Sequence, residues 1–364
     1  MIAIILGTRA ELIKTFPLML ELERREKPYV FIHTGQHSLG KLCEEFGVKK
    51  PDVVLSKPPE KTTKFWTKAG KAIAWSFTII PRIKLSLRKM EGLKFVIYHG
   101  DTMSTASAAI ASSKFLNPQK KWFNVHLEAG LRSGSLFEPF PEEISRRIVT
   151  LFSDILFAPS EIAARNLRGR KHVYQVGNTI VDSILLSIKI ARKKGYKSPK
   201  GKYALMTIHR HENIKNRKRL AKIVEILSYS PITTYWLMHD NTRRQLEKFG
   251  LMEKVKKMKH VRITGLKTYV EFSLWLKNAK FLITDGGSVQ EESLALKKPC
   301  ILLRKRTERI AGLHTGINFL TGLNIEYAKE VLHEVVDMKI PKFKNPYGDG
   351  NASKRIVNVL TTFL

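Results

Sequence analysis

The sequence is poor in cysteine, in acidic residues and in long apolar runs, and each shortage excludes a class of protein. Two cysteines, Cys43 and Cys300, occur in 364 residues. They lie far apart and belong to no metal-type cluster of ligands, which excludes a disulfide framework and a zinc site. No stretch reaches ~18 consecutive apolar residues, so neither a transmembrane helix nor a membrane partner is expected.

The amino-terminal apolar run, residues 2–6, lacks the features of a signal peptide. It is short, no basic segment precedes it, and Thr8, Arg9 and Glu11 follow it closely. We interpret this run as the first buried strand of a cytoplasmic protein.

Acidic residues number 32 against 64 lysines and arginines, which gives a net charge of +32. Such an excess is typical of nucleic-acid-binding proteins, which form the non-enzyme alternative. The charge, however, is spread along the whole chain, for example over residues 215–222 and 254–259, without an aromatic–basic RNA-binding signature. We therefore predict a solvated basic surface without a nucleic-acid partner, whose positive field draws in an anionic small substrate.

Two nucleotide-binding motifs are also missing. No Gly-x-Gly-x-x-Gly follows the first apolar run, and no Gly-x-x-x-x-Gly-Lys-Ser/Thr occurs. These absences argue against a dinucleotide cofactor and against a P-loop enzyme.

Apolar, strand-like runs alternate with amphipathic, helix-like segments along the chain, which predicts parallel sheets covered by helices on both faces. Two such series occur, so we predict an amino-terminal domain over residues 1–176 and a second domain over 177–344. The tail, 345–364, is predicted to contain a helix that crosses back to the first domain. The predicted strands are residues 2–6, 29–33, 95–98, 122–125, 155–158, 173–176, 203–208, 234–238, 261–263, 281–284 and 300–303.

Polar residues follow five of these strands directly. Ligands bind outside the carboxyl ends of the strands in open parallel sheets, so we expect these residues to face a cleft between the two domains. The five segments are Gly7-Thr8-Arg9, His99-Gly100-Asp101-Thr102, residues 126–132, His209-Arg210 and residues 285–288.

The segment Asp285-Gly286-Gly287-Ser288 stands between a predicted strand and a predicted helix. Ser288-x-x-Glu291 has capping-box spacing, which predicts that Ser288 caps the helix. The two glycines allow close approach of a ligand, and the free N–H groups of the helix favour a phosphate. Glu292, one turn further on, is better placed for the hydroxyl groups of a sugar.

Three carboxylates of the first domain are candidates for catalysis, namely Asp101, Glu128 and Glu142. Asp101 has an alternative interpretation as the cap of the following helix, and Glu142, which follows Pro141, as a favourable charge at a helix start. Glu128 has no comparable capping interpretation. The candidate cations for a phosphate are Arg9, Lys14 and His209.

Several short motifs occur here in one order, and together they resemble the non-hydrolysing UDP-N-acetylglucosamine 2-epimerases over nearly the whole chain. The detailed resemblance, with the lysine-rich composition, suggests an archaeal member. The motifs are Gly7-Thr8-Arg9-Ala10-Glu11, Ile13-Lys14, His99-Gly100-Asp101-Thr102, Glu128-Ala129-Gly130-Leu131-Arg132, Pro141-Glu142-Glu143, Gly177-Asn178-Thr179, His209-Arg210, Gln290-Glu291-Glu292 and Asn345-Pro346-Tyr347-Gly348-Asp349-Gly350.

The resemblance implies two Rossmann-like domains of the B-type glycosyltransferase architecture, with the active site in the cleft between them. It also implies reversible conversion of UDP-N-acetylglucosamine into UDP-N-acetylmannosamine, by elimination of UDP to 2-acetamidoglucal and its re-addition. The product would feed surface polysaccharide or glycan synthesis. This reaction uses no NAD and no obligatory metal, and the family's habit is a homodimer. A hydrolysing 2-epimerase and a B-type glycosyltransferase that uses a UDP-sugar are the alternative enzymes.

Site residues are carried over by position. Asp101, Glu128 and Glu142 resemble the catalytic carboxylates, and which is acid and which is base stays open. His209 resembles the residue that contacts the diphosphate and assists its departure. The substrate-binding residues implied by the resemblance are Arg9, Lys14 and Phe272, the diphosphate turn Gly286-Gly287-Ser288, and Glu292 at the ribose. Phe272 lies in a predicted apolar helix, so its residue type by itself indicates a core position.

The chain departs from the family at three places. The common Asp-Ser-Gly-Gly turn of the family is here Asp285-Gly286-Gly287-Ser288. Where bacterial members often have Thr-Glu-Arg-Pro-Glu, this chain has Thr-Glu-Arg-Ile-Ala at residues 307–311. Leu39 ends the stretch that many bacterial members write Gln-His-x-Gln, so activation by a second substrate molecule is not predicted.

Overall fold

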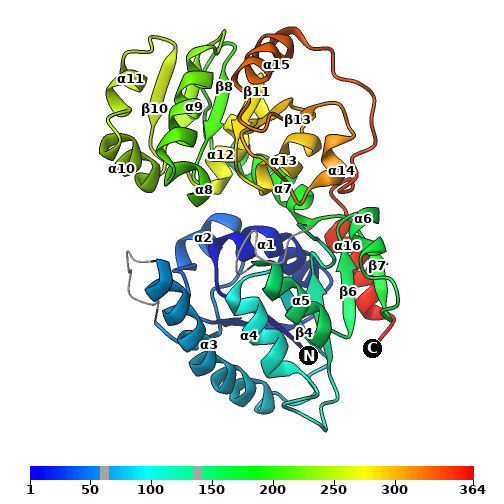
Figure 1. Ribbon diagram of the computed structural model, residues 1–364. Coiled ribbons are helices and arrows are strands. Elements are labelled where there is room, and N and C mark those ends of the chain that lie inside the picture. The colour runs from blue at the N-terminus through cyan, green and yellow to red at the C-terminus, as the bar shows by residue number, and fades with distance from the viewer. Residues whose placement is uncertain (58–64, 134–141) are drawn as a thin grey trace. The chain divides into compact units, whose positions relative to one another are not determined.

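The computed structural model describes residues 1–57, 65–133 and 142–364, which form two compact units. The first unit comprises Met1–Ser183 and Tyr347–Leu364, and the second comprises Ile184–Pro346. The chain leaves the first unit within helix α7 (Thr179–Lys193) and returns to it before helix α16 (Ala352–Thr361), as the colours of Figure 1 show. Each unit is an α/β domain built on its own parallel sheet, which confirms the predicted fold class.

The first unit contains a seven-stranded sheet in the order β3-β2-β1-β4-β5-β6-β7. The chain runs from β1 to one edge of this sheet and then returns to β4, which pairs with the other side of β1. Ligands bind at such a switch point in open α/β sheets. The strands are β1 (Ile2–Leu6), β2 (Tyr29–His33), β3 (Val53–Val54), β4 (Phe95–His99), β5 (Phe123–Leu127), β6 (Ile155–Ala158) and β7 (Val173–Gln175).

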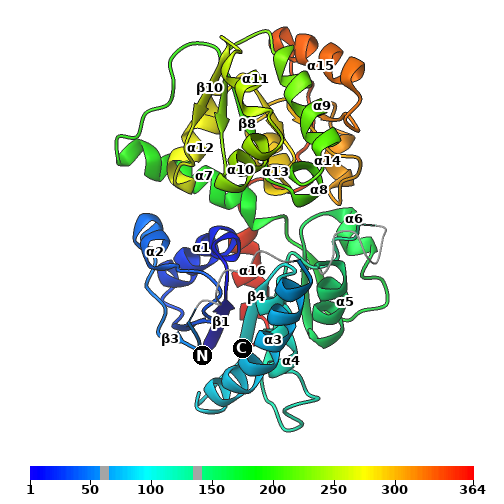
Figure 2. The ribbon, with the colours of Figure 1, turned by 60° about the vertical axis from the view of Figure 1, so that its left-hand side comes forward.

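Helices cover this sheet, and β1 is buried along its whole length. One cluster of buried side chains joins the sheet residues Ile5 and Val96 to Ile79, Ala108 and Val149 of three helices. Figure 2 shows these helices, α3, α4 and α5, grouped along one side of the first unit. The helices before α7 are α1 (Arg9–Arg24), α2 (Gly40–Phe46), α3 (Phe65–Arg88), α4 (Met103–Ser112), α5 (Glu142–Phe152) and α6 (Glu161–Arg165).

Helix α16 is bound to the first unit through its start and its end. At its start, the Asp182 carboxylate accepts hydrogen bonds from the backbone N–H groups of Ala352, at 3.2 Å, and Ser353, at 2.8 Å. Just after the helix, the ring of Phe363 lies edge-on to Phe123 of β5 and Tyr174 of β7. The buried Asp182 thereby supplies the cap that α16 lacks from its own N-cap residue.

The second unit repeats the plan with a six-stranded sheet in the order β10-β9-β8-β11-β12-β13, whose switch point lies between β8 and β11. Helices α9 and α15 pack on one face of this sheet and α12 on the other (Figure 2). The strands are β8 (Ala204–Thr207), β9 (Thr234–Leu237), β10 (Val261–Thr264), β11 (Phe281–Thr284), β12 (Cys300–Leu302) and β13 (Asn318–Leu320). The helices are α8 (His211–Ile214), α9 (Arg217–Ser228), α10 (Asp240–Lys248), α11 (Met252–Lys256), α12 (Tyr269–Asn278), α13 (Ser288–Ala295), α14 (Ile310–Leu313) and α15 (Ile325–Asp337).

Every predicted strand is present within a few residues, and two further strands, β3 and β13, were not predicted. Both are edge strands of two or three residues, too short to give an apolar run. None of the helices in the described part of the chain has the length and apolarity needed to cross a bilayer.

Candidate active site

Glu128 follows β5 and has the most unusual backbone among the predicted carboxylates. Its φ is +64°, in the left-handed region that residues other than glycine seldom adopt. Its carboxylate forms an ion pair with Lys14 of α1 and accepts a hydrogen bond of 2.9 Å from the Asn178 amide. The Lys14 and Glu128 side chains are both buried. Strained backbone of this kind is concentrated at functional sites, which supports a role for Glu128 beyond packing.

Glu11 lies at the switch point of the first sheet and connects the ends of β1 and β4. Its carboxylate accepts hydrogen bonds from the N–H groups of Gly7, at 2.7 Å, and Thr8, at 2.6 Å, in a capping box with Thr8. It also accepts from the hydroxyl groups of Thr102 and Thr105, at the start of α4. Burial raises the pKa of Glu11, and these hydrogen bonds oppose the rise. Glu11 therefore fixes the loops that carry Arg9 and Asp101.

Asp101 follows β4 but does not cap the next helix, so that interpretation is wrong. The cap of α4 is Thr102, whose hydroxyl accepts from the N–H of Thr105 at 3.2 Å. The Asp101 carboxylate instead forms an ion pair of 2.6 Å with Arg146 of α5. A partly exposed carboxylate held by a buried guanidinium group has a defined orientation at the carboxyl end of the sheet.

Glu142 is the first residue of α5, as predicted, and its neighbour Glu143 is far more buried. Glu143 accepts from the backbone N–H of Ser133, at 3.2 Å, and from Arg146, at 3.1 Å. Since Arg146 also binds Asp101, Glu143 orients Arg146 and, through it, Asp101. Pro141 lies outside the described residues. The motif Pro141-Glu142-Glu143 contains both glutamates, and nothing in its pattern indicates that Glu143 carries the buried contacts.

Two buried histidines at the same edge of the sheet predict a pH-dependent stability. Burial lowers the pKa of His99 to about 3 and that of His126 to about 4, from 6.5. The unfolded chain therefore binds protons at a higher pH than the folded one. Stability should be complete above about pH 6.5 and should fall as the pH drops toward 4, by up to about 1.4 kcal/mol per pH unit for each histidine.

Urea unfolding at a series of pH values between 7.5 and 4.5 measures this dependence. His126→Gln keeps an amide donor for the Gly100 carbonyl, which lies 2.8 Å from the imidazole, and should flatten the pH slope. His172→Gln, at an exposed histidine, should leave the slope unchanged. Equal slopes in the wild type and the His126 variant would contradict the assignment.

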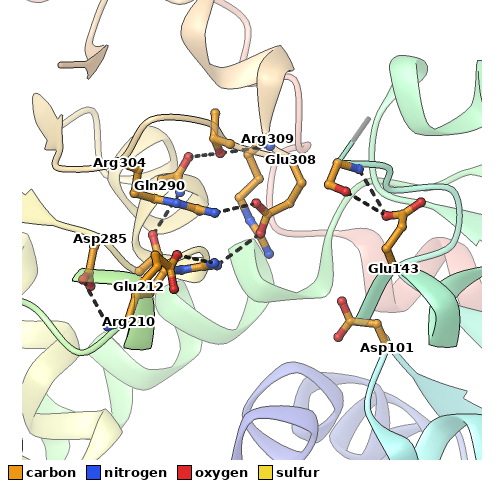
Figure 3. A network of polar contacts seen from close by, with 12 residues as sticks. Asp101, Glu143, Arg210, Glu212, Asp285, Gln290, Arg304, Glu308 and Arg309 are labelled. Atoms are coloured by element: carbon orange, nitrogen blue, oxygen red, sulfur yellow. Dashed lines mark hydrogen bonds and ion pairs between the residues drawn. The ribbon is translucent and has the colours of Figure 1, made fainter. Parts of the chain in front are cut away.

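In the second unit, the fully buried Asp285 joins the ends of β8 and β11. Its carboxylate accepts hydrogen bonds from the backbone N–H groups of His209, at 3.0 Å, and Arg210, at 3.1 Å, and from the Asn213 amide, at 3.0 Å. Figure 3 shows the bond from Arg210 to Asp285. Asp285 thus holds the predicted diphosphate turn beside the loop of His209.

The glycine turn forms as predicted, except that Ser288 is not the helix cap. Helix α13 begins at Ser288, and its N-cap is Gly287, which has no side chain that could cap the helix. The capping box fails because Glu291 is fully buried and its carboxylate forms an ion pair of 3.1 Å with Arg309. Gly286 donates its N–H to the Thr284 hydroxyl at 2.9 Å and Gln290 donates to the Gly287 carbonyl, but a helix start without a side-chain cap still offers N–H groups of its first turn to an anion.

His209 lies beside this turn with its ring partly exposed. Its Nδ1 is 3.7 Å from Asp285 Oδ1, and its ring centroid is 4.8 Å from that of His239, with the two rings tilted by 34°. Burial is the largest cause that lowers the pKa of His239, to about 4. His239 follows β9 and was not predicted, although the same strand-end rule applies to it.

The structure gives contacts for the other residues that are predicted to bind the substrate. The Glu292 carboxylate accepts a hydrogen bond of 2.7 Å from the hydroxyl group of Tyr269, a residue that belongs to none of the sequence motifs. Phe272, in the same helix as Tyr269, is half-buried against the core of the second unit. Arg9 is exposed at the start of α1, and its Nε donates to the Ser38 carbonyl at 3.4 Å. The nucleotide contacts of Phe272, Glu292 and Arg9 therefore stay predictions.

Taken separately, the two units offer different chemistry. The first presents carboxylates suited to proton transfer, and the second presents N–H groups and cations suited to an anion. Within residues 1–57, 65–133 and 142–364, no group of three or more histidine, cysteine, aspartate or glutamate side chains is arranged to hold a metal ion.

A protein-family match and a related protein sequence point to the same family. Residues 20–361 match the family described as UDP-N-acetylglucosamine 2-epimerase. A UDP-N-acetylglucosamine 2-epimerase of Methanocaldococcus jannaschii is 36% identical, over 99% of this chain and 98% of its own length.

Solved structures agree with this similarity. The crystal structure of the M. jannaschii UDP-GlcNAc 2-epimerase in complex with UDP-GlcNAc and UDP has a TM-score of 0.83 at 35% identity, with 99% of each chain covered. The glycosyltransferase of kitacinnamycin, at 10% identity and a TM-score of 0.59 over 100% of this chain and 94% of its own, shares the fold alone.

Proposed function

This chain belongs to the UDP-N-acetylglucosamine 2-epimerase family, and we propose that it interconverts UDP-N-acetylglucosamine and UDP-N-acetylmannosamine without net hydrolysis. The proposal rests mainly on the surroundings of Glu128. Its backbone is strained, and its buried carboxylate is held by Lys14 and Asn178. A carboxylate in such a setting suits proton transfer at a sugar carbon.

The reaction requires an indirect route, because the C2 proton of the sugar is not next to a carbonyl group. In the proposed first step, a carboxylate removes that proton, a double bond forms between C1 and C2, and the C1–O bond breaks with its electrons going to UDP. The resulting 2-acetamidoglucal is flat at C2. Protonation of C2 on the opposite face and attack of the UDP oxygen on C1 then give the epimer.

We propose that side chains of both units act on one substrate molecule. Asp101, Glu128 and Glu142 would transfer the protons, and the assignment of acid and base among them stays open. The uncapped start of α13, Gly286 to Ser288, would bind the diphosphate, with His209 assisting its departure. Lys14, which is ion-paired with Glu128, would act close to the proton transfer rather than as an independent phosphate ligand. The remaining proposed contacts are Arg9 and Phe272 at the nucleotide and Glu292 at the ribose.

Incubation with UDP-N-acetylglucosamine in deuterated water tests this proposal. Proton NMR should show UDP-N-acetylmannosamine with deuterium at C2, because the proton removed from C2 exchanges with solvent before another is returned. Product that keeps its original C2 proton would exclude the elimination route.

The same experiment separates the alternative enzymes. A hydrolysing epimerase would release free N-acetylmannosamine and an equal amount of UDP, whereas the proposed enzyme should keep free UDP at a trace level. A glycosyltransferase would need an acceptor and should show little epimerisation by itself. Steady accumulation of UDP would therefore favour the hydrolysing reaction.

We also propose that the chain forms a homodimer. Helix α3 leaves Phe77 73% exposed and Leu85 58% exposed, and with the exposed Pro81 they follow i, i+4, i+8 spacing on one helix face. An apolar stripe on a helix face suits burial against a second copy. Sedimentation should give a dimer for the wild type and a monomer after Phe77→Glu with Leu85→Glu. A wild-type monomer would refute the proposal.

A further inference from the structure

A buried cluster of charges is formed by the loop after β12 together with Arg210, which follows β8. Its centre is Glu308, whose side chain is 3% exposed. The Glu308 carboxylate contacts Arg304 at 3.1 Å, Arg210 at 3.5 Å, and Arg309 more closely still. Figure 3 shows these three guanidinium groups around Glu308. The arginines hold the pKa of Glu308 far below its ordinary value, although burial acts the other way.

The loop that carries Glu308 is attached to the glycine turn at two further points. The Thr307 hydroxyl donates to the Gln290 side chain at 2.7 Å, and Gln290 in turn donates to the Gly286 carbonyl at 3.0 Å. The Arg309 guanidinium group lies so close to Gly287 that a Cβ built there would be 2.7 Å from Nη1. The position of Arg309 is therefore coupled to the backbone of the turn.

We infer that Glu308 is a positioning residue for the diphosphate turn, which it acts on by holding Arg309 against Gly287. This inference rests on the proposed function, in which the turn binds a diphosphate. Buried guanidinium groups need counter-charges, and without Glu308 the Arg309 guanidinium group keeps the ion pair with Glu291 but loses the second carboxylate that holds it against Gly287. Arg309 then no longer fixes the backbone N–H groups of the turn.

Electrostatics alone predicts the opposite effect, and this makes the inference testable. Glu308 is a negative charge near an anion site, so a role limited to charge balance predicts tighter diphosphate binding when it is removed. A positioning role predicts weaker diphosphate binding. The binding energy lost when the N–H donors are misplaced exceeds the energy gained by removing the repulsion between Glu308 and the diphosphate. The sign of the change separates the two.

The test measures how Glu308→Gln changes the affinity for UDP, by calorimetry, and the affinity for uridine, by NMR. UDP affinity should fall by about tenfold to a hundredfold, while uridine affinity stays within about twofold. Unchanged or tighter UDP binding would overturn the inference. An equal loss for both ligands would also overturn it, because that result indicates general damage to the second unit. A wild-type protein that does not bind UDP would instead refute the proposed function.

Further variants serve as controls for Glu308→Gln. Glu212→Gln makes the same change of charge at an exposed carboxylate that lies 3.4 Å from the Arg210 guanidinium group. This variant should leave UDP affinity unchanged. Glu308→Asp keeps the buried charge, so it should fold and show a smaller loss specific to UDP. In an Arg309→Gln background, Glu308→Gln should cause little further loss of UDP affinity. Full additivity of these two substitutions would show that Glu308 does not act through Arg309.

Discussion

Replacing Glu128 with glutamine is expected to lower kcat by about three orders of magnitude, the scale of general acid–base catalysis. Glutamine has nearly the same shape and still accepts a hydrogen bond from Asn178, but it cannot take up a proton. It also leaves Lys14 without its carboxylate partner. UDP affinity should stay within about threefold, because the proposed diphosphate turn belongs to the second unit. Proton NMR of the epimerisation measures the rate, and calorimetry measures UDP binding.

The chain offers a matched control for this variant. Glu26 is also a glutamate with a left-handed backbone, φ +53°, but it is exposed after the end of α1. Glu26→Gln changes the charge and the backbone preference in the same way as Glu128→Gln, at a position outside the candidate site. It should have wild-type activity. If Glu128→Gln kept kcat within a few-fold of the wild type, Glu128 would not be a proton-transfer group.

Replacing Asp285 with alanine is expected to destabilise the second unit by about 3 kcal/mol or more. The substitution removes the acceptor of three hydrogen bonds, two of them from backbone N–H groups, in a fully buried position. Each unsatisfied buried donor costs about 1–3 kcal/mol. UDP binding should weaken strongly as well, because the glycine turn and the His209 loop lose their common anchor. Hydrogen exchange of the β8 and β11 amides reports the stability of this unit separately.

Asp240→Ala is the control, since Asp240 is an exposed carboxylate in the first turn of α10. Its loss removes a favourable helix-end charge worth less than about 1 kcal/mol. Amide protection in β8 and β11 that was the same in the Asp285 and Asp240 variants would show that Asp285 does not anchor the turn.

Several features of the candidate site were predictable because they depend on local patterns. Apolar runs of strand length revealed the strands, and the polar residues after them revealed the edges of the sheets. The short edge strands β3 and β13 were missed, because two or three residues do not make an apolar run. His239 was missed although the rule that found His209 covers it.

The two capping interpretations failed for a different reason. The sequence spacing favours Ser288 as the cap of α13, and the position of Asp101 makes it a candidate cap of α4. In the structure the N-cap of α13 is Gly287 and that of α4 is Thr102. Glu291 is held by Arg309, and Asp101 by Arg146. Both partners lie outside the local sequence window. An ion pair of a buried guanidinium group outweighs a local capping bond, so local spacing cannot decide such cases.

The sequence by itself determined the fold class, the order of the site segments and the family, because alternating apolar runs and short ordered motifs are properties of neighbouring residues. Only the tertiary structure decided the partner of each side chain. Lys14 meets Glu128 across 114 positions of the chain, and Arg210 meets Glu308 across 98. Such pairs follow from the order of strands in each sheet, which places the ends of β1, β4 and β5, and of β8, β11 and β12, side by side. The physical reason is that burial forces each charge to find its counter-charge wherever the sheet brings one near, and no local pattern records that choice.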